Sequence, residues 1–235
     1  MVAVEAGEVS EIEIRQLAHR FENQSVEAVL EWAVERFAPR VAMTSSFGAE
    51  GIVLIDKLAR VAPGLPIIYL DTGFHFTETE MLKEQLRERY NLNIIEQCAA
   101  QTVTQQAEQY GDKLYERDAD LCCRLRKVEP LREALKNYDA WIAALRRDQS
   151  PTRAGIGVVE WNAKHHLVKF NPLATWTRKR VWDYILSHEL PYNGLYDEGY
   201  ASIGCAPCTR RVTADAHERS GRWDGQTKLE CGIHL

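Results

Sequence analysis

Four of the six cysteines form two close pairs, and such pairs are typical of metal centres. Cys122 and Cys123 are adjacent, and Cys205 and Cys208 enclose Ala-Pro. Four thiolates can bind a tetrahedral zinc ion or an iron–sulfur cluster. Adjacent cysteines on a helix point about 100° apart, so they converge poorly on one ion but can each bind a different iron atom. The spacing therefore favours an iron–sulfur cluster and leaves zinc, or thiols with no common ligand, as the alternatives.

The second pair also has the Cys-x-Pro-Cys pattern of thiol–disulfide oxidoreductases. That function needs the pair at the start of a helix after a strand, in a thioredoxin-like fold. Cys205 and Cys208 instead follow a glycine-rich, aperiodic stretch late in the chain. A redox role for this pair alone would also leave Cys122 and Cys123 unexplained, so a metal centre is the better interpretation.

The other two cysteines are isolated. Cys98 follows a predicted strand, and we predict a buried structural thiol there with no chemistry of its own. Cys231 is followed by Gly-Ile-His-Leu. Because a terminal segment is usually mobile, Cys231 is either a frayed thiol without function or a nucleophile carried on a swinging arm.

Small and polar residues follow the first predicted strand. Val41–Thr44 leads into Ser45-Ser46-Phe47-Gly48-Ala49-Glu50-Gly51, and a predicted helix comes next. Small residues at such a position let backbone N–H groups approach an anion, and the helix N-terminus adds a positive potential. The segment matches neither the Walker A pattern nor Gly-x-Gly-x-x-Gly, so a phosphate site and an ordinary turn both remain open. Asp71-Thr72-Gly73 occupies the equivalent position after the next strand.

Hydrophobic periodicity predicts the elements that position these residues. Predicted helices cover residues 12–21, 26–37, 52–62, 77–90, 103–110, 118–136 and 178–189, and predicted strands cover 41–44, 67–70, 93–95, 140–145 and 167–170. Strands alternating with helices indicate an α/β fold with a mainly parallel sheet. The ligand site is expected at the carboxyl ends of the strands, where the two loops lie.

Composition and charge exclude several classes of protein. The 235 residues, 45% of them hydrophobic, suffice for one large core, and a collagen-like or wholly disordered chain is excluded. The formal net charge of −5 argues against nucleic acid as a partner. No apolar run approaches the length of a membrane span, and the acidic stretch Met1–Glu13 does not resemble a targeting segment. We therefore expect a cytoplasmic protein whose cysteines are reduced.

Four motifs in a fixed order resemble those of the iron–sulfur adenylyl-sulfate (APS) reductases, within the assimilatory sulfonucleotide reductases. They are Cys122-Cys123-Arg124-Leu125-Arg126-Lys127, Gly204-Cys205-Ala206-Pro207-Cys208-Thr209-Arg210, Arg219-Ser220-Gly221-Arg222-Trp223 and Glu230-Cys231-Gly232-Ile233-His234. The segments Ser45–Glu50 and Leu70–Gly73 fit the same family. Phe47 departs from the family pattern, which often has serine just before the glycine, so either Ser45 or Ser46 is the candidate phosphate contact.

The resemblance implies a Rossmann-like fold of the adenine nucleotide alpha hydrolase type, in one domain. Residues 1–40 would form N-terminal helices, residues 41–190 the α/β core, and residues 191–235 a cluster-binding and catalytic tail. The resemblance further implies a [4Fe-4S] cluster on Cys122, Cys123, Cys205 and Cys208, and a catalytic Cys231. In the family reaction this cysteine attacks the sulfur of APS, AMP leaves, and thioredoxin or glutaredoxin releases sulfite from the S-sulfocysteine.

A thiolate that attacks a sulfonate needs nearby cations, because two unit charges about 4 Å apart repel by roughly 4 kcal/mol at a dielectric constant of 20. The predicted substrate contacts are Ser45, Ser46, Gly48, Lys127, Arg153, Arg219, Arg222 and His234, and Arg146 is a further candidate cation. Lys127 lies four residues after Cys123, so a helix places both on one face. Lys127 is therefore predicted to link the cluster to the substrate.

Several alternatives remain. Relatives specific for the 3′-phosphorylated nucleotide (PAPS) lack the cluster cysteines, so both pairs favour APS, while dual use of APS and PAPS stays open. An ATP pyrophosphatase or sulfurtransferase of the same fold would want a Ser-Gly-Gly-x-Asp-Ser-like loop, which this chain lacks. A non-enzymatic zinc or iron–sulfur module that binds a partner is the third alternative. A homo-oligomer is possible.

Overall fold

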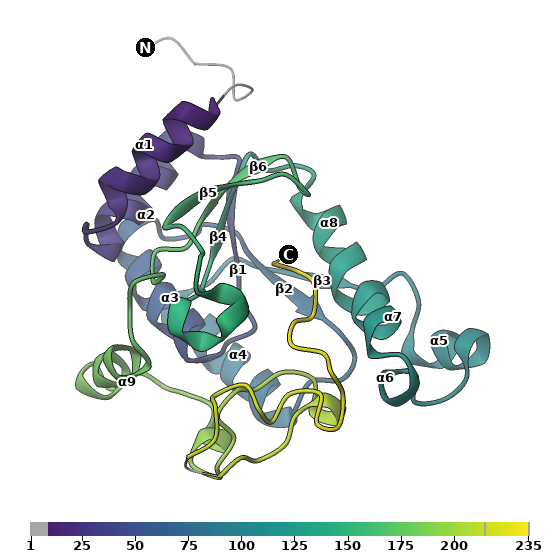
Figure 1. Cartoon of the computed structure of the whole chain (residues 1–235). Helices are drawn as coiled ribbons and strands as arrows, with labels where there is room; N and C mark the ends of the chain where they lie inside the picture. The colour runs from purple at the N-terminus through teal and green to yellow at the C-terminus, as the bar shows by residue number, and fades with distance from the viewer. Residues whose placement is uncertain (1–8, 214, 235) are drawn as a thin grey trace.

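The computed structural model describes residues 9–213 and 215–234, so the first eight residues of the predicted N-terminal segment lie outside it. Six strands form one sheet in the order β3-β2-β1-β4-β6-β5 (Figure 1). They are β1 (Val41–Thr44), β2 (Ile67–Asp71), β3 (Ile94–Cys98), β4 (Ala140–Ala143), β5 (Val159–Asn162) and β6 (Leu167–Phe170). All pairings are parallel except β5 with β6. The predicted mainly parallel sheet is confirmed, and β5 is an addition that periodicity missed.

Nine α-helices surround the sheet within the described residues. They are α1 (Glu11–Phe21), α2 (Val26–Phe37), α3 (Ala49–Val61), α4 (Thr77–Tyr90), α5 (Val103–Tyr110), α6 (Leu114–Arg117), α7 (Ala119–Cys123), α8 (Glu129–Leu135) and α9 (Arg178–Ser187). Ser10, Ser25 and Thr177 cap α1, α2 and α9 through their hydroxyl groups, which accept hydrogen bonds from backbone N–H groups of the first turn. Except for the short α6, which was not predicted, these helices lie within the predicted ones to within a few residues.

The predicted helix over 118–136 is not continuous. A π-helix, η1 (Arg124–Val128), separates α7 from α8. The reason is Pro130 in the first turn of α8. Proline has no N–H to donate to the preceding turn, and its ring clashes with the carbonyl there. The wider π turn resolves this conflict, and the Glu129 N–H reaches the carbonyl of Arg124.

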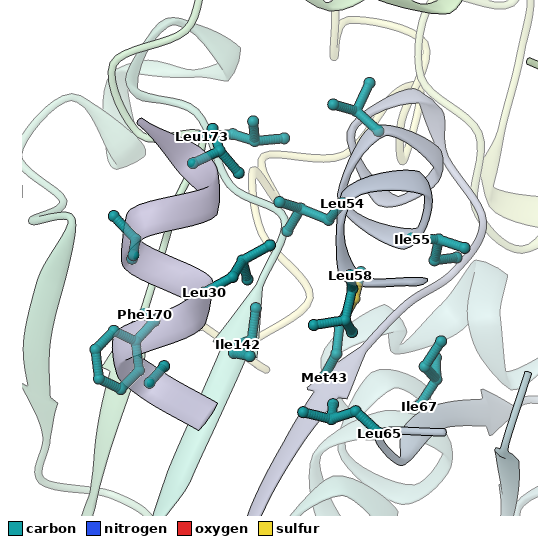
Figure 2. Close-up of a cluster of buried hydrophobic side chains, with 14 of the residues drawn as sticks. Leu30, Met43, Leu54, Ile55, Leu58, Leu65, Ile67, Ile142, Phe170 and Leu173 are labelled. Atoms are coloured by element: carbon teal, nitrogen blue, oxygen red, sulfur yellow. The ribbon is translucent and has the colours of Figure 1, made fainter. Parts of the chain in front are cut away.

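The strands bury both faces, each against a different set of helices. Met43, Ile67 and Ile142 point toward α2 and α3, where they pack with Leu30 and Leu54 (Figure 2). The neighbouring strand residues Ala42, Ile68, Trp141 and Ala143 point to the opposite face, where Leu131 and Leu135 of α8 cover them. This alternation follows from the period of two along a strand. The result is a doubly wound α/β sandwich.

The strand order reverses at β1. The chain passes from β1 to β2 and β3 on one side of the sheet, and returns with β4 on the other side of β1. Ligands of open α/β sheets bind at such a switch point, outside the carboxyl ends of the strands. The C-terminal tail, yellow in Figure 1, runs back across this edge of the sheet. Its Ile233 packs against the cluster of Ala42, Trp141 and Leu145.

Two further sequence-based expectations can be compared with the structure. Cys98 is exposed rather than buried, because β3 is an edge strand whose residues are all partly or fully exposed. In the described part of the chain, no helix is long and apolar enough to cross a membrane.

Candidate active site

The largest concentration of predicted site residues lies around one cavity at the carboxyl ends of β1, β2 and β4. Its walls include Ser45, Ser46, Gly48, Lys127, Arg153, Arg219, Arg222, Cys231 and His234. These are the nine positions that the sequence predicted for substrate binding and nucleophilic attack. Segments up to 189 residues apart, from Ser45 to His234, therefore meet at the switch point.

The β1–α3 loop forms one wall of the cavity. Ser45 is buried and its hydroxyl accepts a hydrogen bond of 3.0 Å from the Phe47 N–H, whereas Ser46 is exposed. Phe47 has a left-handed backbone with φ 56° and packs its ring against Tyr69, which explains how a bulky residue fits this turn. Gly48 is the N-cap of α3 and supplies no side-chain cap. The N-terminus of α3 therefore faces the cavity with its positive end, as a phosphate site requires.

The four paired cysteines line a second, smaller cavity together. Cys122 and Cys123 come from α7, while Cys205 is the N-cap and Cys208 the last residue of the short 3-10 helix η5 (Ala206–Cys208). Cys122, Cys123 and Cys205 are buried, and Cys208 is half-buried. Phe74 is among the residues that complete the wall. Four thiols from two distant segments thus meet in one largely enclosed space.

This donor set fits a multi-iron centre. Adjacent cysteines of one helix diverge, and a cluster offers each of them its own iron corner. Among residues 9–213 and 215–234, no three His, Cys, Asp or Glu side chains are arranged to hold a metal ion as they stand. Burial raises the pKa of Cys122 to about 12 and that of Cys123 to about 11. Metal binding would therefore have to displace protons from these thiols.

Lys127 lies between the two cavities and lines both of them. Burial disfavours its charged form, but the negative charge that Cys205 and Cys231 carry as thiolates outweighs burial, and the pKa of Lys127 is raised. The same ammonium group, together with the Thr72 hydroxyl, lowers the pKa of Cys205 in spite of burial. The position agrees with the predicted link between cluster and substrate.

The tail residues Cys231 and His234 line the same cavity. Cys231 also packs against the cluster of Ala119, Cys123 and Trp223, so its sulfur lies near the cysteine-lined cavity. His234 stacks on Trp141 with ring centroids 5.2 Å apart and an interplanar angle of 13°. Burial holds the pKa of His234 well below its ordinary value, so the imidazole is neutral here.

Two arginines offer unused donors. The Nε atoms of Arg219 and Arg222 are buried and have no hydrogen-bond partner among the described residues. Buried donors without partners are costly, and an anion in the cavity would satisfy them. Arg153 differs, because its Nε and both terminal nitrogens are already bound to the side chains of Glu230 and Gln149.

Arg146 is not one of the cations that line the cavity. It is fully buried and binds Glu50 and Glu218 through hydrogen bonds of 2.7 to 3.0 Å, and it also contacts Asp148. These carboxylates therefore neutralise the charge of Arg146 within the protein. The sequence did not reveal this role, because two of its three acidic partners, Glu50 and Glu218, come from α3 and from the tail, which lie far apart in the chain. Glu230 was not among the predicted site residues.

Comparisons with known proteins agree with this geometry. Residues 40–211 match the family model described as the phosphoadenosine phosphosulfate reductase domain. The chain belongs to this family. The predicted resemblance to sulfonucleotide reductases is thereby confirmed, and the adenine nucleotide alpha hydrolase-type fold with it.

Named relatives of this sulfonucleotide reductase cover nearly its whole length. A phosphoadenosine 5′-phosphosulfate reductase of Gloeobacter violaceus is 48% identical, over 96% of this chain and 95% of that protein. The adenosine 5′-phosphosulfate reductase 1 of Bacillus subtilis is 49% identical, over 88% of this chain and 89% of that protein. The crystal structure of phosphoadenylyl-sulfate reductase from Candida auris, in a phosphate complex, superposes with a TM-score of 0.76 and is 32% identical, covering 87% of this chain and 98% of that one.

Proposed function

We propose that this sulfonucleotide reductase reduces APS to sulfite and AMP, with Cys231 as the nucleophile. The observation that carries the proposal is the meeting of Cys231, Lys127, Arg222 and the N-terminus of α3 around one cavity. The helix terminus and its loop suit the phosphate of a nucleotide, and the cations suit a sulfonate. A thiol at the same cavity supplies the group that attacks sulfur.

The reaction balances with a dithiol as reductant. The Cys231 thiolate attacks the sulfur of APS, a sulfur–sulfur bond forms, the bond from sulfur to the phosphate oxygen breaks, and AMP leaves. A thiolate of thioredoxin or glutaredoxin then attacks the Cys231 sulfur, and sulfite leaves with the electron pair of the broken bond. The second thiol of the partner displaces Cys231 and completes a disulfide. Two electrons thus pass from the dithiol to the sulfonate sulfur.

The chain's own cations lower the barrier to the first step. Lys127, Arg219 and Arg222 line the cavity beside Cys231, where they offset the repulsion between thiolate and sulfonate. Cys122, Cys123, Cys205 and Cys208 would hold the proposed [4Fe-4S] cluster. When bound, that cluster would fix α7 to the η5 segment and modify the electrostatics of the sulfonate site. A reducing compartment, the cytoplasm, is part of the proposal because the mechanism needs free thiols.

Intact mass spectrometry tests the nucleophile and the substrate together. Incubation with APS without any dithiol should add the mass of one SO3 group to the parent protein and nothing to Cys231→Ser. PAPS in a parallel reaction should give a slower or smaller gain. An adduct that persists in Cys231→Ser would refute the assignment, and equal rates with both nucleotides would establish dual use in place of APS preference.

The cluster has its own test. Protein purified without oxygen should contain iron and acid-labile sulfide and absorb visible light. Cys205→Ser should lose these features, whereas Cys98→Ser, at an exposed thiol outside both cavities, should retain them. Zinc in place of iron in the parent protein would contradict the cluster assignment. A change in the cluster's oxidation state during a single turnover would contradict its non-redox role.

A further inference from the structure

Glu230 is buried next to the nucleophile, yet it does not line the substrate cavity. Its carboxylate accepts two hydrogen bonds of 2.8 Å from Arg153 and one of 3.1 Å from Arg219. The hydroxyl groups of Ser150 and Thr152 donate to the same carboxylate, at 3.2 and 3.0 Å. The four lone-pair sites of a carboxylate are thus fully used. The protein thus binds the Glu230 side chain of its own tail in the way that it would bind a free carboxylate ligand.

Three of the four residues that bind Glu230 come from outside the C-terminal tail. Ser150, Thr152 and Arg153 belong to the segment that follows β4 and forms the 3-10 helices η2 (Arg147–Gln149) and η3 (Pro151–Arg153). The Ser150 and Thr152 hydroxyl oxygens also lie 2.8 Å apart, so when one donates its single proton to the other, only the second hydroxyl donates to Glu230. This segment is part of the cavity wall, through Gln149 and Arg153. Binding of Glu230 therefore fixes the tail relative to the substrate site.

The ion pairs of Glu230 explain how an acidic residue can lie next to the nucleophile Cys231. A carboxylate beside Cys231 would oppose its ionisation if the two groups shared one environment. Here the Glu230 carboxylate, which does not line the cavity, is paired with the guanidinium groups of Arg153 and Arg219, while Cys231 lines the cavity. Burial disfavours the carboxylate, but Arg153 and Arg219 outweigh burial and hold the pKa of Glu230 below its ordinary value. The ion pairs are therefore formed at neutral pH.

We propose that Glu230 is the positioning residue that docks the tail, binding Arg153 and Arg219 so that Cys231 faces the bound sulfonucleotide. The inference rests on the proposed function, because the proposed function supplies the substrate that Cys231 of the docked tail attacks. Glu230 itself touches no reacting atom. It acts through the position of Cys231, and it leaves Arg222 and the Nε of Arg219 to the substrate.

Alkylation of Cys231 without substrate measures docking directly. In Glu230→Gln the tail should leave the wall more often, so the peptide carrying Cys231 should react with iodoacetamide about ten- to a hundredfold faster than in the parent. Glu230→Asp keeps the charge but shortens the reach, and should give an intermediate rate. Arg211→Gln is the matched control, because it removes an exposed ion pair with Glu198 and a contact with the Tyr200 ring in the same region, neither of which involves Glu230, and should leave the rate unchanged.

A second measurement separates positioning from substrate binding. With APS, Glu230→Gln should form the sulfonated protein about ten- to a hundredfold more slowly, while the dissociation constant for APS stays the same or falls. The double variant with Arg153→Gln should be alkylated no faster than Arg153→Gln alone, because the two residues act as one unit.

The outcomes distinguish this inference from the proposed function. If the parent is sulfonated but Glu230→Gln shows parent-like rates of alkylation and sulfonation, Glu230 has no positioning role. If APS affinity falls in parallel with the sulfonation rate, Glu230 belongs to substrate binding and the inference is wrong. If the parent itself is not sulfonated, the proposed function fails, and the alkylation experiment still decides whether Glu230 docks the tail.

Discussion

Lys127 lines both the cysteine-lined cavity and the substrate cavity. In Lys127→Gln the sulfonate loses a cation, and hydrogen bonds to charged groups contribute about 1.5 to 3 kcal/mol. We therefore expect kcat/KM for APS to fall about 10- to 100-fold. Steady-state kinetics with Lys136→Gln as the comparison check this, because Lys136 pairs with exposed Glu133 at the end of α8 and does not line the cavity. Parent-like turnover and affinity in Lys127→Gln would remove Lys127 from the site.

Arg146 contributes to stability rather than to substrate binding. Arg146→Met leaves Glu50 and Glu218 buried without their cation, and such a loss costs about 3 to 5 kcal/mol. Urea denaturation should show this as a lower free energy of unfolding. Lys179→Met, which breaks an exposed pair with Asp183, should cost only about 0 to 1 kcal/mol. Equal stability of the two variants would contradict the structural role of Arg146.

At the scale of residues, motif spacing predicted which side chains line the cavity, but it did not predict which side chains pair with one another. The nine predicted substrate and nucleophile positions line one cavity, since ordered motifs carry both residue type and position. Arg146 was misread as a cation of the site, because two of its three charge partners, Glu50 and Glu218, are 96 and 72 residues away in the chain. The environment of Cys98 was wrong for a related reason, since edge position in a sheet is a property of topology.

The β1–α3 loop depends on the absence of a side chain at Gly51. A Cβ at this position would lie 2.6 Å from the Ser45 hydroxyl oxygen, so Gly51→Ala must displace Ser45. Alanine favours the helix by about 1 kcal/mol, which offsets part of the strain. We expect a free energy of unfolding within about 1 kcal/mol of the parent and a KM for APS raised about 3- to 10-fold. Gly155→Ala, with nothing within 4 Å of its Cβ, is the control, and an unchanged KM in Gly51→Ala would show that Ser45 contributes nothing to binding.

At the scale of elements, the sequence predicted regular strands and helices and missed the irregular ones. β1, α4, α5 and β6 have their predicted bounds because apolar periodicity follows the buried face directly. The π-helix η1 was read as α-helix, since its apolar spacing is nearly the same and only Pro130 signals the break. β5 was missed because Val159–Asn162 is short and closes an antiparallel edge.

At the scale of the whole molecule, the tail is a separate element that completes the site only when docked. It holds Cys231 through Glu230 on one side and through His234 on the other, where the imidazole stacks on Trp141. Composition could not predict this placement, because residues 191–235 carry little periodicity and their contacts are with side chains of distant segments. The place of the ligand site, at the carboxyl ends of the strands, could be predicted, since parallel α/β sheets bind ligands there.

Docking of the tail should depend on pH through His234. The imidazole is buried among the cations Lys169, Arg153 and Arg219 and beside His165, while Glu160 and Glu230 pair with Lys169 and Arg153. Burial and these cations lower its pKa well below the ordinary value of 6.5, so the docked form holds a neutral ring. Undocking in acid therefore takes up a proton. The free energy of docking is at its full value above pH 6.5 and falls by about 1.4 kcal/mol per pH unit below it.

Hydrogen exchange of the C-terminal peptide measures this dependence, once rates are corrected for the intrinsic effect of pH. Between about pH 7.5 and 5.5, protection in the parent should be constant down to about pH 6.5 and then decrease about tenfold per unit. His234→Asn has no group that titrates there, so its protection should be lower at neutral pH and independent of pH. A flat profile in the parent would mean that His234 is not held neutral against Trp141. An equal slope in His234→Asn would assign the titration to another group, of which His165 is the nearest candidate, because burial lowers its pKa to about 4.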